Sequence, residues 1–279
     1  ALGDFNIQAA IRRLQSYRRS DGSLSYWPGA PEASPFGSVY ALHFLQEAEN
    51  AGYAVPAELK KSLSGYVSSV VKDSKAGDFV RAYGLYALAL AGQPHRGVMN
   101  SLRSAKGESG DARWLLAAAY ACDGKADLAR EMIAGLPYQG GDTRYGYFGS
   151  EDRNKAIALK VYTLVGKQEE AFKVASDLAR SLSDPTHYMS TQSTAWALYA
   201  MCDHALSASG NGISGLAEFG GKSSRLETDK SVVSQMLLED GEGGRKTLKL
   251  TNNGKNAVYA VTSVTGIPAA GEEKAQQSG

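Results

Sequence analysis

Cysteine, histidine and long apolar runs are all scarce in this sequence. Two Cys and four His occur among its 279 residues, too few for a disulfide framework or a Cys-based zinc site. The longest apolar stretches, such as residues 85–91 and 115–121, fall far short of the roughly 20 residues that span a bilayer. The sequence therefore predicts neither a disulfide-stapled miniprotein nor a membrane-spanning helix.

An excess of charge of either sign is also missing. The 30 Lys and Arg residues nearly balance the 29 Asp and Glu residues, which leaves a formal net charge of +1. Nucleic acid binding needs clustered Lys and Arg, so no nucleic acid partner is predicted. The chain begins at Ala1 without a Met or a leader and ends in a polar tail, residues 271–279. We therefore expect it to be a piece of a longer protein.

Composition changes near residue 210. Of the 25 Phe, Tyr and Trp residues, only Phe219 and Tyr259 lie beyond this point. A chain of this length forms one large or two ordinary domains. The change predicts a boundary between residues 1–210 and residues 211–279.

The first region contains a series of Ala- and Leu-rich segments. In residues 80–91 and 156–165, large apolar side chains recur at intervals typical of a helix that is buried on most sides. Gly92, Gly124 and Gly166 follow such runs, and a glycine in the left-handed conformation commonly ends a helix. We predict about ten helices in antiparallel pairs, given a typical helix length of about 10 to 14 residues.

The second region alternates between apolar and polar residues, as β-strands do. Short strand-like runs occupy residues 232–238, 246–251 and 258–264. Asn253-Gly254 between the last two runs is typical of a hairpin turn. We predict a small antiparallel β region of about five strands, which is few for a sandwich that must bury two faces.

Several short patterns are similar to catalytic motifs, but their surroundings favour structural roles. Gly-x-Gly-x-x-Gly at residues 210–215 follows a helix instead of linking a strand to a helix, so a linker is predicted. Gly-Lys-Ser at residues 221–223 lacks the upstream glycine of a phosphate-binding loop and indicates a solvated turn. Ser69 and Lys72 have Ser-x-x-Lys spacing without a partner motif, which favours a polar position beside a solvated lysine.

Metal and thioester chemistry have no support in the residue spacing. The four His are scattered, and the ligand types at residues 202–204 point about 100° apart on a helix, so they cannot converge on one ion. Cys122 and Cys202 are predicted to be small buried residues. An internal thioester needs Cys-x-x-Gln, but Lys125 and Ala205 stand three residues after the two Cys. No catalytic, cofactor-binding, metal-binding or thioester residue is predicted in this chain.

Three segments carry a family resemblance. Residues 14–29 read LQSYRRSDGSLSYWPG, residues 39–56 read VYALHFLQEAENAGYAVP, and residues 188–200 read YMSTQSTAWALYA. They resemble the α/α-toroid thioester domain of bacterial α2-macroglobulin-like proteins, relatives of complement, and residues 252–268 resemble the β-domain that follows it. The family-motif positions are Asp21, Gly22, Tyr26, Trp27, Pro28, Gly29, Ser190, Thr191, Gln192 and Trp196.

These motif residues are interpreted as structural. Asp21-Gly22 predicts a tight turn after a helix, with Tyr26 and Trp27 packing back over the helix ends. Ser190 or Thr191 is expected to cap a helix that carries Thr194, Trp196 and Leu198 inward.

The resemblance implies a mainly α fold. Residues 1–210 would form an N-terminally truncated α/α toroid of antiparallel helix pairs, and residues 211–279 part of an antiparallel β-sandwich domain. It implies a non-catalytic fragment of a broad-spectrum inhibitor that traps proteases in the bacterial periplasm or cell envelope. The implied partners are neighbouring β-sandwich domains and target proteases, and no cofactor is implied.

Two other interpretations stay open. An α/α-toroid enzyme acting on isoprenoids needs an acidic cluster such as Asp-x-Asp-Asp, which the sequence lacks. One acting on glycans needs two carboxylates at the barrel mouth, for which Glu151 and Asp152 are the nearest candidates, although a solvated helix cap explains them. A helical-repeat binding scaffold stays open and superhelical, so closure of the helices into a ring would argue against it.

Overall fold

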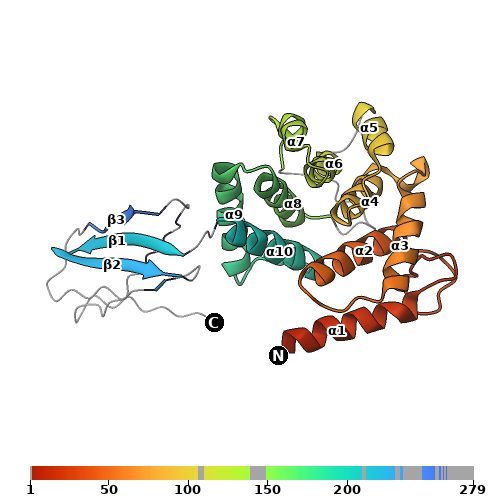
Figure 1. Ribbon diagram of the computed structural model, residues 1–279, viewed down its shortest axis with the longest axis horizontal. Coiled ribbons are helices and arrows are strands. Elements are labelled where there is room, and N and C mark those ends of the chain that lie inside the picture. Colours follow the sequence, from red (N-terminus) through yellow and green to blue (C-terminus); the bar gives the residue numbers. More distant parts are fainter. Residues whose placement is uncertain are drawn as a thin grey trace. The chain divides into compact units, whose positions relative to one another are not determined.

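The computed structural model describes residues 2–105, 110–138, 149–208, 212–229, 233–234, 247–254, 258, 260 and 262. The chain divides into two compact units, Ala1–Ser207 and Ala208–Gly279 (Figure 1). The predicted fold class, mainly α with a small antiparallel β region, is confirmed.

The first unit is built from helices. In chain order they are α1 (Leu2–Leu14), η1 (Gln15–Tyr17), α2 (Pro35–Asn50), α3 (Ala57–Val70), η2 (Ser74–Ala76), α4 (Asp78–Leu90), α5 (Arg96–Ser104), α6 (Gly110–Cys122), α7 (Ala126–Ile133), α8 (Glu151–Leu164), α9 (Gln168–Ser183) and α10 (Thr191–Ala208), where η1 and η2 are short 3₁₀ helices.

Alternate helices differ in how much of their surface is buried. Helix α4 buries most of its residues, whereas α9 buries Ala171, Val174 and Leu178, a single stripe at helical spacing. A helix that is apolar on most sides belongs inside, and a helix with one apolar stripe covers it. Accordingly α2, α4, α6 and α8 pack side by side as an inner layer, with α3, α5, α7 and α9 packed against them.

Helix α10 completes this inner layer. On one side Ser193 Oγ lies 2.7 Å from Ser150 Oγ, directly before α8. On the other side the Tyr199 hydroxyl donates a 2.6 Å hydrogen bond to Glu47 Oε1 of α2. The first and last inner helices therefore contact each other, and the inner helices close into a ring (Figure 1).

Glycines end three of the inner helices as predicted. Gly92, Gly124 and Gly166 stand two residues after the last residues of α4, α6 and α8 and have φ of +73°, +75° and +73°. This conformation lets the next backbone N–H groups reach back to the last turn, as when Gln93 N donates to Leu88 O.

The second unit contains strands β1 (Ile213–Phe219), β2 (Lys222–Thr228) and β3 (Lys249–Asn252) in the order β2-β1-β3, antiparallel throughout. Gly220 and Gly221 join β1 to β2 with φ of +56° and +74°. Two consecutive residues with positive φ are what a type I′ hairpin turn requires.

The β predictions are only partly confirmed. The predicted strand at 246–251 overlaps β3, whereas the predicted strands at 232–238 and 258–264 lie largely outside the described residues. The predicted linker at 210–215 is wrong for residues 213–215, which begin β1.

Candidate functional site

The Asp21-Gly22 motif forms the predicted tight turn. Asp21 Oδ1 accepts hydrogen bonds from Ser23 N at 3.0 Å and from Ser23 Oγ at 2.6 Å. Gly22 has a φ of +84°, and a Cβ at this position would lie 2.7 Å from the Ser62 carbonyl oxygen of α3. Only glycine fits there without strain, because both the backbone conformation and the close approach exclude a side chain.

The aromatic pair after this turn does not pack as predicted. Tyr26 and Trp27 are 56% and 67% exposed, with their rings in edge-to-face contact at 5.2 Å. The expectation that they cover the helix ends is wrong. Residues 27–30 instead form a tight turn, in which Ala30 N donates a hydrogen bond to Trp27 O and Gly29 has a φ of +76°.

The second motif begins α10. Ser190 Oγ accepts a 3.2 Å hydrogen bond from Ser193 N, so Ser190, and not Thr191, is the side-chain cap. Trp196 is buried as expected, but Leu198 is 51% exposed, which corrects its predicted inward orientation. The Gln192 side-chain oxygen is buried without a hydrogen-bond partner among the described residues.

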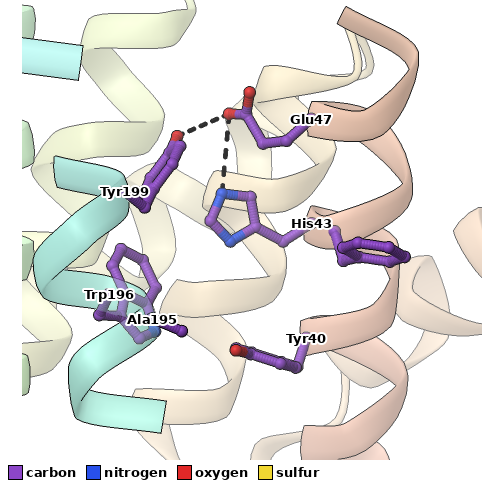
Figure 2. Close-up of a pocket in the computed structure, with 7 residues that line it drawn as sticks. Tyr40, His43, Glu47, Ala195, Trp196 and Tyr199 are labelled. Carbon is purple, nitrogen blue, oxygen red and sulfur yellow. Dashed lines mark hydrogen bonds and ion pairs between the residues drawn. The ribbon is translucent and has the colours of Figure 1, made fainter. Parts of the chain in front are cut away.

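A pocket of about 150 Å³ lies where α2 meets α10. We call it the seam pocket; it is lined by Tyr40, His43, Phe44, Glu47, Ala195, Trp196 and Tyr199. Figure 2 shows side chains of the two helices pointing toward one another across it. All seven lie in the segments 39–56 and 188–200 that carry the family resemblance, but only Trp196 is one of the family-motif positions.

A chain of hydrogen bonds crosses the closed ring beside this pocket. The Tyr199 hydroxyl donates to Glu47 Oε1 at 2.6 Å and lies 3.1 Å from the Tyr86 hydroxyl of α4. His43 Nδ1 lies 2.9 Å from the Tyr83 hydroxyl. Burial raises the pKa of Tyr86 and of Tyr199, so both hydroxyls keep their protons and act as donors.

Glu47 is ionised in this setting. Burial raises the pKa of its carboxyl, but the contact with His43 and the hydrogen bond from Tyr199 lower it by more, to about 2. His43 is only 6% exposed, and burial lowers its pKa, so its imidazole is neutral near pH 7. Nearby, Lys160 of α8 pairs with Asp203 at 2.9 Å and lies 4.6 Å from the centre of the Tyr199 ring.

A second polar cluster lies at the N-terminal ends of the inner helices. Arg153 and Asp111 form a fully buried ion pair at 3.0 Å. Arg153 also donates to Asn154 Oδ1 and lies over the Phe79 ring at 4.5 Å. Because every group has a partner, this cluster is a structural crosslink between α4, α6 and α8.

Glu151 and Asp152, the nearest candidates for a glycan-processing pair, have different partners. Asp152 is buried and lies 2.8 Å from His187 Nε2, which corrects the predicted solvated position. Glu151 instead forms an ion pair with Lys155 at 2.8 Å. The two side chains do not face one another across a cleft.

The cysteines also differ from each other. Cys122 is half-buried, and this burial raises the pKa of its thiol to about 11, which makes it a poor nucleophile. Cys202 is exposed on α10, so its predicted burial is wrong. Over the part of the chain that the structure describes, no three His, Cys, Asp or Glu residues are placed to hold a metal ion. Among the same residues, no helix is long and apolar enough to cross a bilayer.

A closed ring of paired helices together with a small antiparallel sheet defines the class of fold. It is the fold of the C-terminal region of bacterial α2-macroglobulin, as comparison with solved structures shows. Native α2-macroglobulin from Escherichia coli, from domain MG7 to the C-terminus, superposes with a TM-score of 0.63 at 18% identity, over 91% of this chain and 41% of that one. Salmonella α2-macroglobulin reacted with methylamine gives 0.60 at 19% identity, over 88% of this chain and 16% of that one.

The sequence comparison agrees. An α2-macroglobulin homologue of Yersinia pestis is 28% identical over 101 residues, which is 35% of this chain and 5% of that protein. No protein-family model matches the chain. The chain is therefore α2-macroglobulin-like, as its sequence motifs predicted, and it spans less than half the length of each of these relatives.

Proposed function

We propose that this chain is a non-catalytic module of an α2-macroglobulin-like protein that traps proteases. The observation that carries the proposal is the similarity in fold to bacterial α2-macroglobulin over 91% of the chain. In this proposal residues 1–210 form the α/α toroid, residues 211–279 form part of a β-sandwich domain, and the partners are neighbouring β-sandwich domains and target proteases. In this proposal the protein lies in the periplasm or cell envelope, as the family resemblance implies.

The internal geometry supports a non-catalytic role. The charged groups at the N-terminal ends of α6 and α8 are paired with one another, as in the fully buried Arg153–Asp111 pair, instead of facing an open cleft. The contact between Tyr199 and Glu47 closes the ring, and ring closure is not expected of an open helical-repeat scaffold.

The proposal includes the absence of an internal thioester from this chain. Neither Cys122 nor Cys202 has Gln three residues later, and the Cys122 thiol is further deactivated by burial. In this proposal, a longer protein that contains this chain could bind a protease through a thioester only if the thioester lay outside these 279 residues. The motif residues Asp21, Gly22 and Ser190 act in this proposal as folding determinants of the toroid.

The experiment is co-elution of the whole protein with a protease. The protein is incubated with trypsin, and the mixture is separated by size exclusion. We expect trypsin to elute with the large protein and to keep its activity on a small chromogenic peptide. Elution of all trypsin at its own size, with the large protein cleaved but unbound, would contradict the proposal.

A further inference from the structure

The seam pocket contains a carboxylate, Glu47, that makes no direct ion pair with a Lys or Arg among the described residues. Glu47 Oε1 accepts from the neutral Tyr199 hydroxyl. His43 Nε2 lies 3.8 Å from the same oxygen. Lys160 is paired with Asp203, and its charge acts on Glu47 only from beyond ion-pair distance, where it lowers the pKa of the carboxyl. Within the described residues, no Lys or Arg lies at ion-pair distance from Glu47.

His43 adds an unpartnered polar atom beside that carboxylate. Its Nδ1 is engaged by the Tyr83 hydroxyl, but its Nε2 is buried and has no hydrogen-bond partner among the described residues. Nε2 faces Glu47 Oε1 at 3.8 Å, beyond hydrogen-bond distance. In the tautomer whose Nδ1–H donates to the Tyr83 hydroxyl, Nε2 can accept a hydrogen bond from a donor that lies between the two groups. A buried polar atom without a partner is uncommon and indicates a missing ligand or water. Figure 2 shows the imidazole and the Glu47 carboxylate adjacent to each other at the seam.

Aromatic rings form the other walls of the pocket. Tyr40 and Phe44 come from α2, and Trp196 and Tyr199 come from α10. The face of an aromatic ring attracts cations, most strongly when the site is shielded from water. The ring of Tyr199 already has one cation over it, the Lys160 ammonium at 4.6 Å.

We propose that the seam pocket binds a small primary alkylammonium ion. The ammonium group would donate N–H hydrogen bonds to Glu47 and to His43 Nε2, and the alkyl chain would lie against Tyr40, Phe44 and Trp196. A pocket of about 150 Å³ matches the volume of an apolar cavity that holds a benzene-sized ligand, so a short alkyl chain fits it. The site is separate from the proposed trapping function, so either proposal stands if the other fails.

The test compares a cation with a neutral molecule of the same shape. The 279-residue chain, labelled with ¹⁵N, is titrated with n-butylammonium chloride or with 1-butanol while the indole N–H signals are followed by NMR. We expect butylammonium to shift the Trp196 signal, identified with Trp196→Phe, with saturation in the millimolar range. The signals of Trp27 and Trp114, outside the pocket, should not move. 1-Butanol should bind at least about tenfold more weakly, because it lacks the charge that Glu47 attracts.

Two variants of α2 separate the pocket carboxylate from general charge. Glu47→Gln keeps an oxygen acceptor for Tyr199 but removes the charge, and should weaken butylammonium binding about tenfold or more. Glu49→Gln is the matched control, because Glu49 is paired with Lys60 outside the pocket, and should bind as the unaltered chain does. Equal binding of butylammonium and 1-butanol, equal effects of the two variants, or no shift of Trp196 would overturn the proposal. The comparison of the two ligands on the unaltered chain holds even if Glu47→Gln unfolds.

Discussion

Replacing Gly22 by Ala tests whether the Asp21-Gly22 motif is a folding determinant. Gly22 has a φ of +84°, and the left-handed conformation costs a residue with a Cβ about 1–2 kcal/mol. The new Cβ would also lie 2.7 Å from the Ser62 carbonyl oxygen, a backbone atom of α3 that cannot rotate away. Overpacking of this kind costs about 1–3 kcal/mol. We expect Gly22→Ala to lower the free energy of unfolding by about 2–5 kcal/mol.

The chain offers a matched control in the same loop. Gly29 has a φ of +76°, but a Cβ there would have no heavy atom within 4 Å. Gly29→Ala should therefore cost only the conformational part, about 1–2 kcal/mol. The difference between the two variants isolates the contact with α3.

Urea unfolding followed by tryptophan fluorescence measures both variants. All three Trp residues, Trp27, Trp114 and Trp196, lie in the first unit, so the signal reports the helical ring alone. The midpoint should fall further for Gly22→Ala than for Gly29→Ala, with similar slopes. Equal losses in the two variants, or a loss below about 0.5 kcal/mol for Gly22→Ala, would refute the reasoning.

Three further predictions concern the polar and thiol groups of the ring. Asp111→Asn should lower the free energy of unfolding by about 3–5 kcal/mol, because the Arg153 charge would stay buried without its carboxylate. A loss below about 1 kcal/mol, measured by urea unfolding, is typical of an exposed pair and would contradict the burial of this one. A thiol reagent at pH 8 should label Cys202 at least about tenfold faster than Cys122, whose burial raises its pKa to about 11; equal rates in peptide mapping would contradict the burial of Cys122. The folded-state pKa of Glu47, about 2, lies below its ordinary 4.5, so its ionisation stabilises the fold above pH 4.5 and this contribution is lost as the pH falls toward 2; the stability difference between the unaltered chain and Glu47→Gln should shrink over that range, and a constant difference would argue against the lowered pKa.

The sequence predicted the helices well because burial on most sides leaves a strong pattern, whereas their closure into a ring was implied by the family resemblance. The run that became α4 is apolar nearly throughout, and Gly92 marks its end in the conformation that only glycine adopts easily. The Asp21-Gly22 turn was equally predictable, since its hydrogen bonds are local.

The errors have physical causes too. The buried residues of β1 are Gly215 and Ala217, whose small size hides the alternation that large apolar residues would show. In α10, Trp196 and Ala200 share the buried face with Ser193, which leaves Leu198 on the opposite side. A search for large apolar residues alone could not assign that face.

The seam pocket could not be predicted from local patterns. Glu47 and Tyr199 are 152 residues apart in the sequence, and they meet only because the inner helices close into a ring. His43 on an apolar helix is typical of an ordinary buried histidine. Its unpartnered Nε2 is visible only once the structure places it beside Glu47.

The central claim, that the chain belongs to a non-catalytic protease trap, is tested most directly by the size selectivity of a captured protease. The whole protein is mixed with an equimolar amount of trypsin, and hydrolysis of a small peptide is compared with hydrolysis of casein. A trap leaves the peptide activity largely intact, because small molecules still reach the protease, and it suppresses casein hydrolysis. Equal activity on both substrates, with or without the protein, would contradict the account.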